Sequence, residues 1–223
     1  MTLRHRSLLV GLLHSDSAMP SGSFAFSWGL EELYDDEVLS DKERFSDVLE
    51  WYLVTRWASF DRFFVHHSFL ASPERRRELD LWCTAASTGA AGRESSVRAG
   101  RALLLAWSRM GLTRAADFTQ LIHAGEVHGN LPIVQGLIYA ECGMDQSMAA
   151  GVSGWTFLSN LASAAVRMGH VSALASQKAL IDTLDGLAEL LDSPIPETPT
   201  SWGVIQDIAM ERHALRTSRL FAS

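Results

Sequence analysis

The chain has 223 residues, which is the length of one large domain or two small ones and is enough for a substantial buried core. Hydrophobic residues make up 47% and charged residues 20%, which excludes an intrinsically disordered chain. The formal net charge of -7 excludes a general electrostatic attraction for nucleic acid or anionic lipid. The longest purely apolar run is Ala102–Trp107, which is too short to span a membrane.

The first segment, Met1–Ser15, places Arg4 and Arg6 before a short apolar run. A signal peptide has the same polarity but a longer apolar region, so we predict the first helix of the domain here. The chain has two cysteines, Cys83 and Cys142, far apart in the sequence. This excludes a disulfide framework and a multi-cysteine zinc site, and we expect a cytoplasmic protein.

Helical periodicity dominates the rest of the chain, and no segment alternates as a strand would. The clearest helix is predicted over Asp41–Ala71, with Ser40 as N-cap and Glu43 completing a capping box. Further helices are predicted from Pro73 to Gly89, over Gly92–Met110, from Thr113, over Pro132–Gly143, Asp145–Met168 and Ser172–Leu191. We predict an all-α, single-domain bundle of about eight to nine helices, with residues 1–192 as its core.

The composition changes at Ser193–Thr200, which holds three of the six prolines. We predict a rigid connector over 193–203, followed by a C-terminal segment, 204–223, that need not pack continuously on the core. Leu220 and Phe221 lie almost at the terminus, where an unattached apolar side chain gains nothing. Together with Arg216 and Arg219, they suit a segment that becomes ordered against a partner, or alternatively one docked on its own domain or across a homodimer.

The polar residues give no convincing pattern for catalysis or metal binding. The pair His66-His67 and the set His123, Glu126 and His128 do not match known ligand spacings. Neither a phosphate-binding glycine loop nor a nucleophile elbow occurs. We therefore predict no catalytic residue, no cofactor-binding residue and no metal ligand.

The most unusual local element is Met19–Glu31, where a Pro-Ser-Gly-Ser turn precedes a dense apolar group. By its residues alone it is equally a plug for the core and a structured contact loop. It also resembles the N-terminal signature of the urease accessory protein F family. The matching residues are Pro20, Gly22, Phe24, Ser27, Gly29, Leu30 and Glu31.

Four further motifs of that family have counterparts here, in the same order. They are Arg93–Arg101, the segment from His128 to Leu137, the stretch Leu158–Arg167, and a terminus with His213 and Ser218–Ser223. Two departures follow. After Arg167 the family pattern Pro-Leu-Gly-Gln is replaced by His170–Ala173, so that Gln177 alone matches the next Gly-Gln, and Ala214 stands where a carboxylate usually follows the histidine.

The resemblance implies a non-enzymatic, usually dimeric accessory protein for urease maturation. Such proteins bind a second accessory protein, of D or H type, and with it recruit a G-type GTPase that carries nickel to apo-urease. Nickel is then cargo and GTP belongs to the partner, so no cofactor of its own is expected. The residues expected to bind partners are Pro20, Gly22, Phe24, Ser27, Gly29, Glu31, Arg167, Gln177, His213, Arg219, Leu220 and Phe221.

Two other functions remain open at this point. One is an all-α, cysteine-dependent small-molecule hydrolase of thiaminase type, which would use Cys142 or Cys83 as nucleophile. The other is a generic helical adaptor unrelated to urease.

Overall fold

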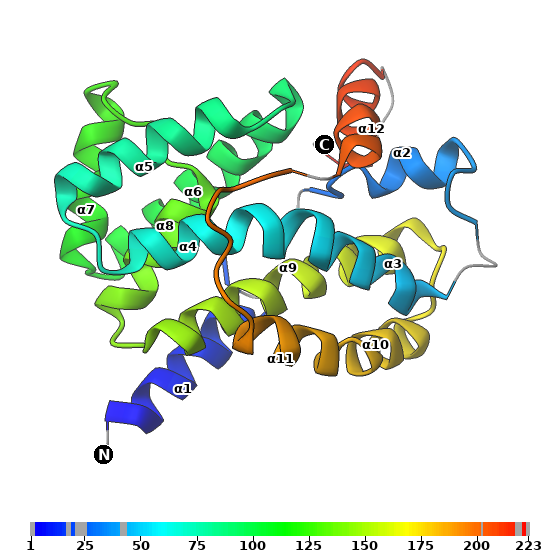
Figure 1. Cartoon of the computed structure of the whole chain (residues 1–223), viewed down its shortest axis with the longest axis horizontal. Helices are drawn as coiled ribbons and strands as arrows, with labels where there is room; N and C mark the ends of the chain where they lie inside the picture. Colours follow the sequence, from blue (N-terminus) through cyan, green and yellow to red (C-terminus); the bar gives the residue numbers. More distant parts are fainter. Residues whose placement is uncertain are drawn as a thin grey trace.

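The computed structural model describes residues 3–16, 19–20, 26–40, 44–201, 203–216 and 220–221 (Figure 1). The regular secondary structure of these residues is entirely helical. The helices are α1 Leu3–Ser15, α2 Leu30–Asp35, α3 Phe45–Tyr52, η2 Leu53–Asp61, α4 Arg62–Phe69, α5 Pro73–Ala86, α6 Ala90–Arg109, α7 Thr113–His123, α8 Leu131–Glu141, α9 Gln146–Met168, α10 Ala173–Asp182, α11 Leu184–Asp192 and α12 Val204–Ala214.

This architecture confirms the predicted all-α, single-domain fold. α3, the π-helical η2 and α4 form one continuous helix, and α10 and α11 are separated by Thr183 alone. The described residues therefore form ten continuous helical stretches, where about eight to nine helices were predicted, and the short α2 is an addition to the predicted ones.

Several predicted helix ends are confirmed by their capping bonds. The Ser72 hydroxyl accepts a hydrogen bond from the Arg75 backbone N–H at 3.2 Å, and the Asp145 carboxylate accepts one from Met148 at 2.7 Å. Gly169 ends α9 in the left-handed conformation, with φ of 83°.

The prediction that Ser40 caps the second predicted helix is wrong. The helix begins at Phe45, with an extended Arg44 in the N-cap position. The chain before it is bonded to α2, because the Leu39 backbone N–H donates a hydrogen bond of 2.9 Å to the Leu33 carbonyl oxygen. Asp41–Glu43, which include the predicted capping-box glutamate, lie outside the described residues.

The buried side chains form two hydrophobic clusters. The first gathers α2, α3, η2, the C-terminal half of α9, and α10 to α12, with Leu49, Tyr52 and Leu158 fully buried. The second gathers α4 to α8 and the start of α9, with Phe60 and Phe64 fully buried. The long helix α3–η2–α4 and helix α9 cross the molecule and contribute to both clusters (Figure 1).

The tightest packing joins α4 and α8, whose backbones meet at Gly136. A Cβ atom on Gly136 would lie 2.0 Å from the Ser68 hydroxyl oxygen and 2.8 Å from the Val65 carbonyl oxygen. The start of α8 is fixed from the other side, because the buried Asp80 carboxylate accepts backbone N–H bonds from Gly129 and, at 2.8 Å, from Asn130. α8 is thus held at a fixed depth between α4 and α5.

We expect Gly136→Ala to lower the free energy of unfolding by about 1–3 kcal/mol, because the added methyl group has no room against backbone. Gly186→Ala in α11 is the matched control, since a Cβ atom there meets no atom within 4 Å. The control should be neutral or stabilise by up to about 1 kcal/mol through helix propensity. Urea unfolding of the two variants measures both effects, and equal stability of the two would contradict the packing argument.

Helix α1 is anchored by His14. This side chain is 2% exposed, stacks parallel to Trp107 and meets the Tyr139 ring edge-on with centroids 4.7 Å apart. Among the residues that the structure describes, neither ring nitrogen has a hydrogen-bond partner, and burial lowers the pKa of His14 to about 3. The imidazole is therefore neutral in the folded protein and serves as an aromatic packing group.

This anchor predicts acid sensitivity. The unfolded chain takes up the His14 proton below a pKa of about 6.5, whereas the folded chain does so only near 3. The stability from this group is therefore fully present above the unfolded pKa and falls as the pH drops toward the folded one. Between pH 7 and pH 4.5, we expect wild type to lose about 2 kcal/mol more unfolding free energy than His14→Phe. His5→Gln, at an exposed histidine of the same helix, should keep the wild-type slope.

The described residues of the proline-rich stretch 193–203 contain no helix. The stretch is fixed to the core. The Thr200 backbone N–H donates a hydrogen bond of 2.9 Å to the Ser59 carbonyl oxygen, and the Arg62 guanidinium donates one of 2.7 Å to the Ser193 carbonyl oxygen. After it, α12 packs against α2 and α6. This packing corresponds to the alternative in which the C-terminal segment docks on its own domain, while its partner-binding role stays a prediction.

Candidate partner-binding site

The C-terminal segment closes onto the N-terminal signature, and we call the resulting cluster the C-terminal latch. It consists of α2, α12, Leu220–Phe221 and Arg167 at the end of α9. Figure 1 shows α12 standing against α2, so that residues from opposite ends of the sequence lie side by side.

The close approach of α12 to α2 depends on Gly29. This residue precedes α2 with φ of 81°, a conformation that glycine adopts without strain. A Cβ atom here would lie 3.0 Å from the Gln206 carbonyl oxygen and 3.1 Å from the Met210 side chain. Ser27, two residues earlier, is fully buried. The signature motif therefore supplies the surface on which α12 rests.

Opposite charges align the two helices of the latch. Glu32 is 2% exposed, and its carboxylate lies 2.7 Å from the Arg216 guanidinium and 3.6 Å from that of Arg212. The same two arginines also pair with Asp35 and Asp36 at the end of α2. A buried carboxylate costs free energy unless it is paired. Glu32 therefore requires basic side chains opposite it, at the end of α12 and just after it.

Glu31 and His213 hold the chain terminus. The Glu31 carboxylate accepts backbone hydrogen bonds from Leu220 at 2.9 Å and from Phe221 at 3.2 Å. The fully buried His213 places its Nε2 atom 3.5 Å from Glu31 and 3.4 Å from the Phe221 carbonyl oxygen. A carboxylate that accepts two N–H bonds fixes the position of the backbone that follows α12.

The end of α9 completes the latch. The Arg167 guanidinium lies 4.4 Å from the centroid of the Phe221 ring, and that ring is 4% exposed. His170, which belongs to the segment that departs from the family pattern, stacks on Tyr34 of α2 with ring centroids 3.9 Å apart. The departure is therefore accommodated by an aromatic contact within the latch.

The structure brings together six of the twelve residues expected to bind partners: Gly29, Glu31, Arg167, His213, Leu220 and Phe221. Ser27 is buried beside them, and Pro20 is exposed. Gln177 is exposed on α10, on the other side of α3 and α9 from α12 (Figure 1), and is not part of the latch. Gly22, Phe24 and Arg219 lie outside the described residues.

Four residues of the latch were not predicted from the sequence: Arg212 and the three carboxylates of its acidic side, Glu32, Asp35 and Asp36. The pattern that could have revealed them is the spacing of Arg212 and Arg216, which puts two cations on one helical face, opposite a run of carboxylates in α2.

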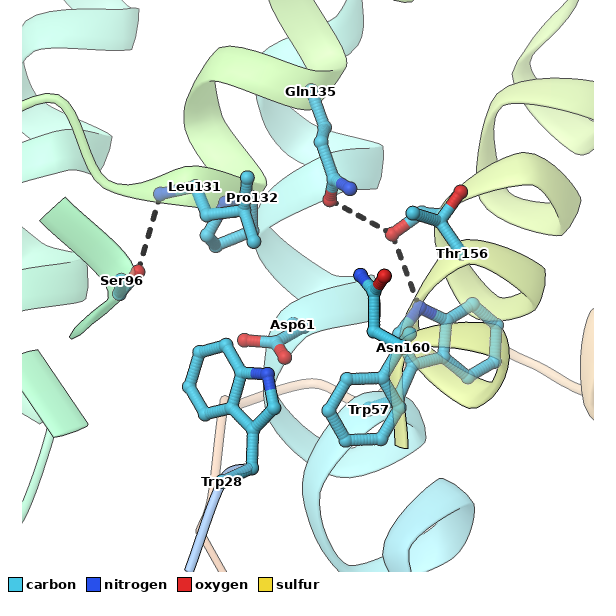
Figure 2. Close-up of a pocket in the computed structure, with 11 residues that line it drawn as sticks. Trp28, Trp57, Asp61, Ser96, Leu131, Pro132, Gln135, Thr156 and Asn160 are labelled. Atoms are coloured by element: carbon cyan, nitrogen blue, oxygen red, sulfur yellow. Dashed lines mark hydrogen bonds between the residues drawn. The ribbon is translucent and has the colours of Figure 1, made fainter. Parts of the chain in front are cut away.

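A second polar group lies inside the core, in the enclosed cavity drawn in Figure 2. The Trp57 indole N–H donates to Ser153 at 3.2 Å, and the Ser153 hydroxyl donates to Gln135 at 2.9 Å. The buried Asp61 pairs with Arg56 at 3.2 Å, and burial raises the pKa of Asp61. The cavity measures about 20 Å³, room for one water molecule and too little for an organic substrate.

The cysteines do not form a nucleophilic site. Cys83 and Cys142 are 1% and 3% exposed. Burial raises the pKa of the Cys83 thiol well above its usual range and that of Cys142 to about 11. Both are therefore thiols at neutral pH, whereas the thiolate is the nucleophile.

Three residues of the two histidine sets considered as metal ligands make other contacts in the structure. Glu126 pairs with Arg77 at 3.0 Å, and the His66 and His67 rings meet edge-on. Within the part of the chain that the structure describes, no three His, Cys, Asp or Glu side chains gather closely enough to hold a metal ion. Nor is any of its helices long and apolar enough to cross a membrane.

The structure is an all-helical body in which the C-terminal helix α12 packs on α2, at the end of the signature motif. The UreF family model matches residues 39–183, and the chain belongs to the UreF family. It is 28% identical to urease accessory protein UreF 1 of Brucella melitensis, over 96% of this chain and 93% of the relative. It is 25% identical to UreF of Trichodesmium erythraeum, with 94% of each chain covered, and 24% identical to a UreF-like protein of Schizosaccharomyces pombe, with 96% of each covered. The family membership gives the chain the role of a urease accessory protein.

The latch predicts that Phe221, rather than its neighbour, holds the terminus. Phe221→Ala removes a buried ring and its contact with Arg167, and such truncations cost about 3 kcal/mol in a packed site. We expect backbone hydrogen exchange at Leu220 and Arg216 to accelerate by about tenfold or more. Leu220→Ala is the control, because that side chain is 66% exposed and should leave the rates unchanged. Similar rates in both variants would contradict the role given to the Phe221 ring.

Proposed function

We propose that this urease accessory protein binds a second accessory protein of D or H type through the surface of the C-terminal latch. With that partner it recruits or regulates a G-type GTPase that carries nickel, and the assembly delivers nickel to apo-urease. Nickel is cargo and GTP belongs to the GTPase, so the chain acts as scaffold and chaperone without a cofactor of its own. We further propose that it works as a cytoplasmic homodimer.

One observation carries the proposal. Glu31, Arg167, His213 and Phe221, which come from three separate family motifs, contact one another in a single cluster. Here the latch keeps Leu220 66% exposed and the Arg212 side chain 58% exposed. Exposed apolar side chains and exposed arginines both occur in partner surfaces.

The rival function as a cysteine-dependent hydrolase finds no support, because both thiols are buried and have raised pKa values. A generic adaptor unrelated to urease finds none either, because the chain belongs to the UreF family. The proposal therefore concerns which partners the accessory protein binds and by which surface.

The proposal predicts that Arg167→Ala reduces both co-purification of the D- or H-type protein and activation of urease in cells that co-express the full set of accessory proteins. We expect a loss of about tenfold, the size usual for a central interface arginine. Arg109→Ala is the matched control, because Arg109 is also an exposed arginine in the last turn of a long helix but lies outside the latch. Unchanged pull-down and activation by Arg167→Ala would refute the assigned surface.

A further inference from the structure

A groove distant from the latch has the features of a binding site. It lies between α5 and α7, which both pack on α8 but hardly on each other, at the opposite side of the molecule from α12 (Figure 1). Its volume is about 600 Å³, within the usual range of about 300–1,000 Å³ for ligand sites. The lining residues are Phe69, Leu70, Ala71, Ser72, Pro73, Arg76, Arg114, Asp117, Phe118, Leu121 and Leu137.

The groove has an apolar floor. Phe69, Phe118 and Leu137 are 5%, 4% and 2% exposed and belong to the second hydrophobic cluster. Leu70, by contrast, is 79% exposed at the end of α4. An apolar floor beside an exposed leucine matches a ligand that brings apolar side chains of its own.

Two arginines give the groove a positive charge. Arg76 is 5% exposed, and its Nε and Nη2 atoms donate to the carbonyl oxygens of Ser68 and Ala71. Its Nη1 atom has no such partner among the described residues. Arg114 is exposed and lies close enough to disfavour the charge on Arg76, whose pKa is lowered to about 10 by burial and by this neighbour.

Within the part of the chain that the structure describes, neither arginine forms an ion pair with a carboxylate. Glu141 accepts a hydrogen bond from the backbone N–H of Arg114 and not from its guanidinium. Asp117, the one acidic residue in the lining, stands beyond ion-pair distance of both arginines. The starts of α5 and α7 also border the groove, and helix N-termini add positive potential.

We infer that the groove between α5 and α7 binds an acidic–apolar peptide segment of a protein partner. In this arrangement a carboxylate of the peptide lies between Arg76 and Arg114, and its large apolar side chains cover Leu70, Phe118 and Leu121. A buried arginine that lacks a counter-charge favours an anionic ligand, and the guanidinium fork suits a carboxylate. The inference rests on the proposed function only in taking the source of the segment to be a protein.

Peptide binding to the full-length protein tests the site. The probe is a fluorescent, capped heptapeptide, Gly-Leu-Asp-Leu-Glu-Phe-Gly, and its twin carries Asn and Gln in place of the acids. We expect the acidic peptide to bind about tenfold more tightly than the twin by fluorescence anisotropy. Equal affinity of the two peptides, or no binding of the acidic one at millimolar concentration, overturns the inference.

Variants locate the bound peptide. Arg76 holds the backbone of its own loop, so its replacement endangers folding, and the exposed Arg114 is the better target. Arg114→Gln should weaken binding of the acidic peptide by about tenfold and leave the affinity for the twin unchanged, whereas Arg109→Gln should change neither affinity. Asp117→Asn should strengthen binding of the acidic peptide, because it removes the one negative charge in the lining, which repels the peptide's carboxylates. Unchanged affinity in Arg114→Gln overturns the site.

Leu70→Gln tests the apolar half of the site. It should weaken the binding of both peptides, and Leu174→Gln, at an equally exposed leucine of α10, should weaken the binding of neither. An equal loss in the two variants overturns the location. Dodecanoate is the competing probe, and displacement of the peptide by micromolar dodecanoate overturns the inference in favour of a lipid ligand.

The test separates this inference from the proposed function. Phe221→Ala alters the latch and should leave peptide affinity unchanged, while Arg114→Gln should leave hydrogen exchange in the latch unchanged. Failure of the proposed function appears as unchanged pull-down in Arg167→Ala, and failure of the groove appears in the anisotropy measurement.

Discussion

Helices α4 and α8 meet backbone to backbone at Gly136, and the positions of the other helices follow from that contact. A Cβ atom there would collide with the Ser68 hydroxyl, so the distance between the two helices is set by the absence of a side chain. α8 is buried along nearly its whole length and carries apolar residues on every face. It therefore forms the centre on which α4, α6, α7 and α9 pack, and the loop before it is fixed by Asp80.

The latch, at the other end of the molecule, is held largely by polar and charged contacts. The buried Glu32 pairs with Arg216, which follows α12, and the partly buried Glu31 accepts hydrogen bonds from the backbone of Leu220 and Phe221. A polar network of this kind is sensitive to the loss of any one member, since each leaves a buried group without a partner. The same property makes it a surface that a partner can strengthen or release.

The sequence predicted the helical fold well because its evidence is local. Ser72, Asp145 and Gly169 lie within a few residues of the helix ends that they define, and the structure confirms all three. The prediction that Ser40 is an N-cap failed because Leu39 hydrogen-bonds to Leu33 of α2, a contact that no capping pattern reveals. The short α2 was also missed, since a single turn and a half has little periodicity to detect. The contact of Glu31 with His213 joins the two ends of the sequence, so only the resemblance to a family pointed to both residues.

The π-helical turns of η2, in the middle of the long helix, have a consequence for how that helix can change. Upstream of them Leu49 and Tyr52 face the first hydrophobic cluster, and downstream Phe63 and Phe64 face the second. The wider turns adjust the angular register between the two halves, and one residue of an α-helix corresponds to about 100° of rotation. A single-residue deletion within Leu53–Asp61 would therefore swing one row of aromatic side chains out of its cluster, however conservative the residues left behind. The length of this segment is consequently more constrained than its composition.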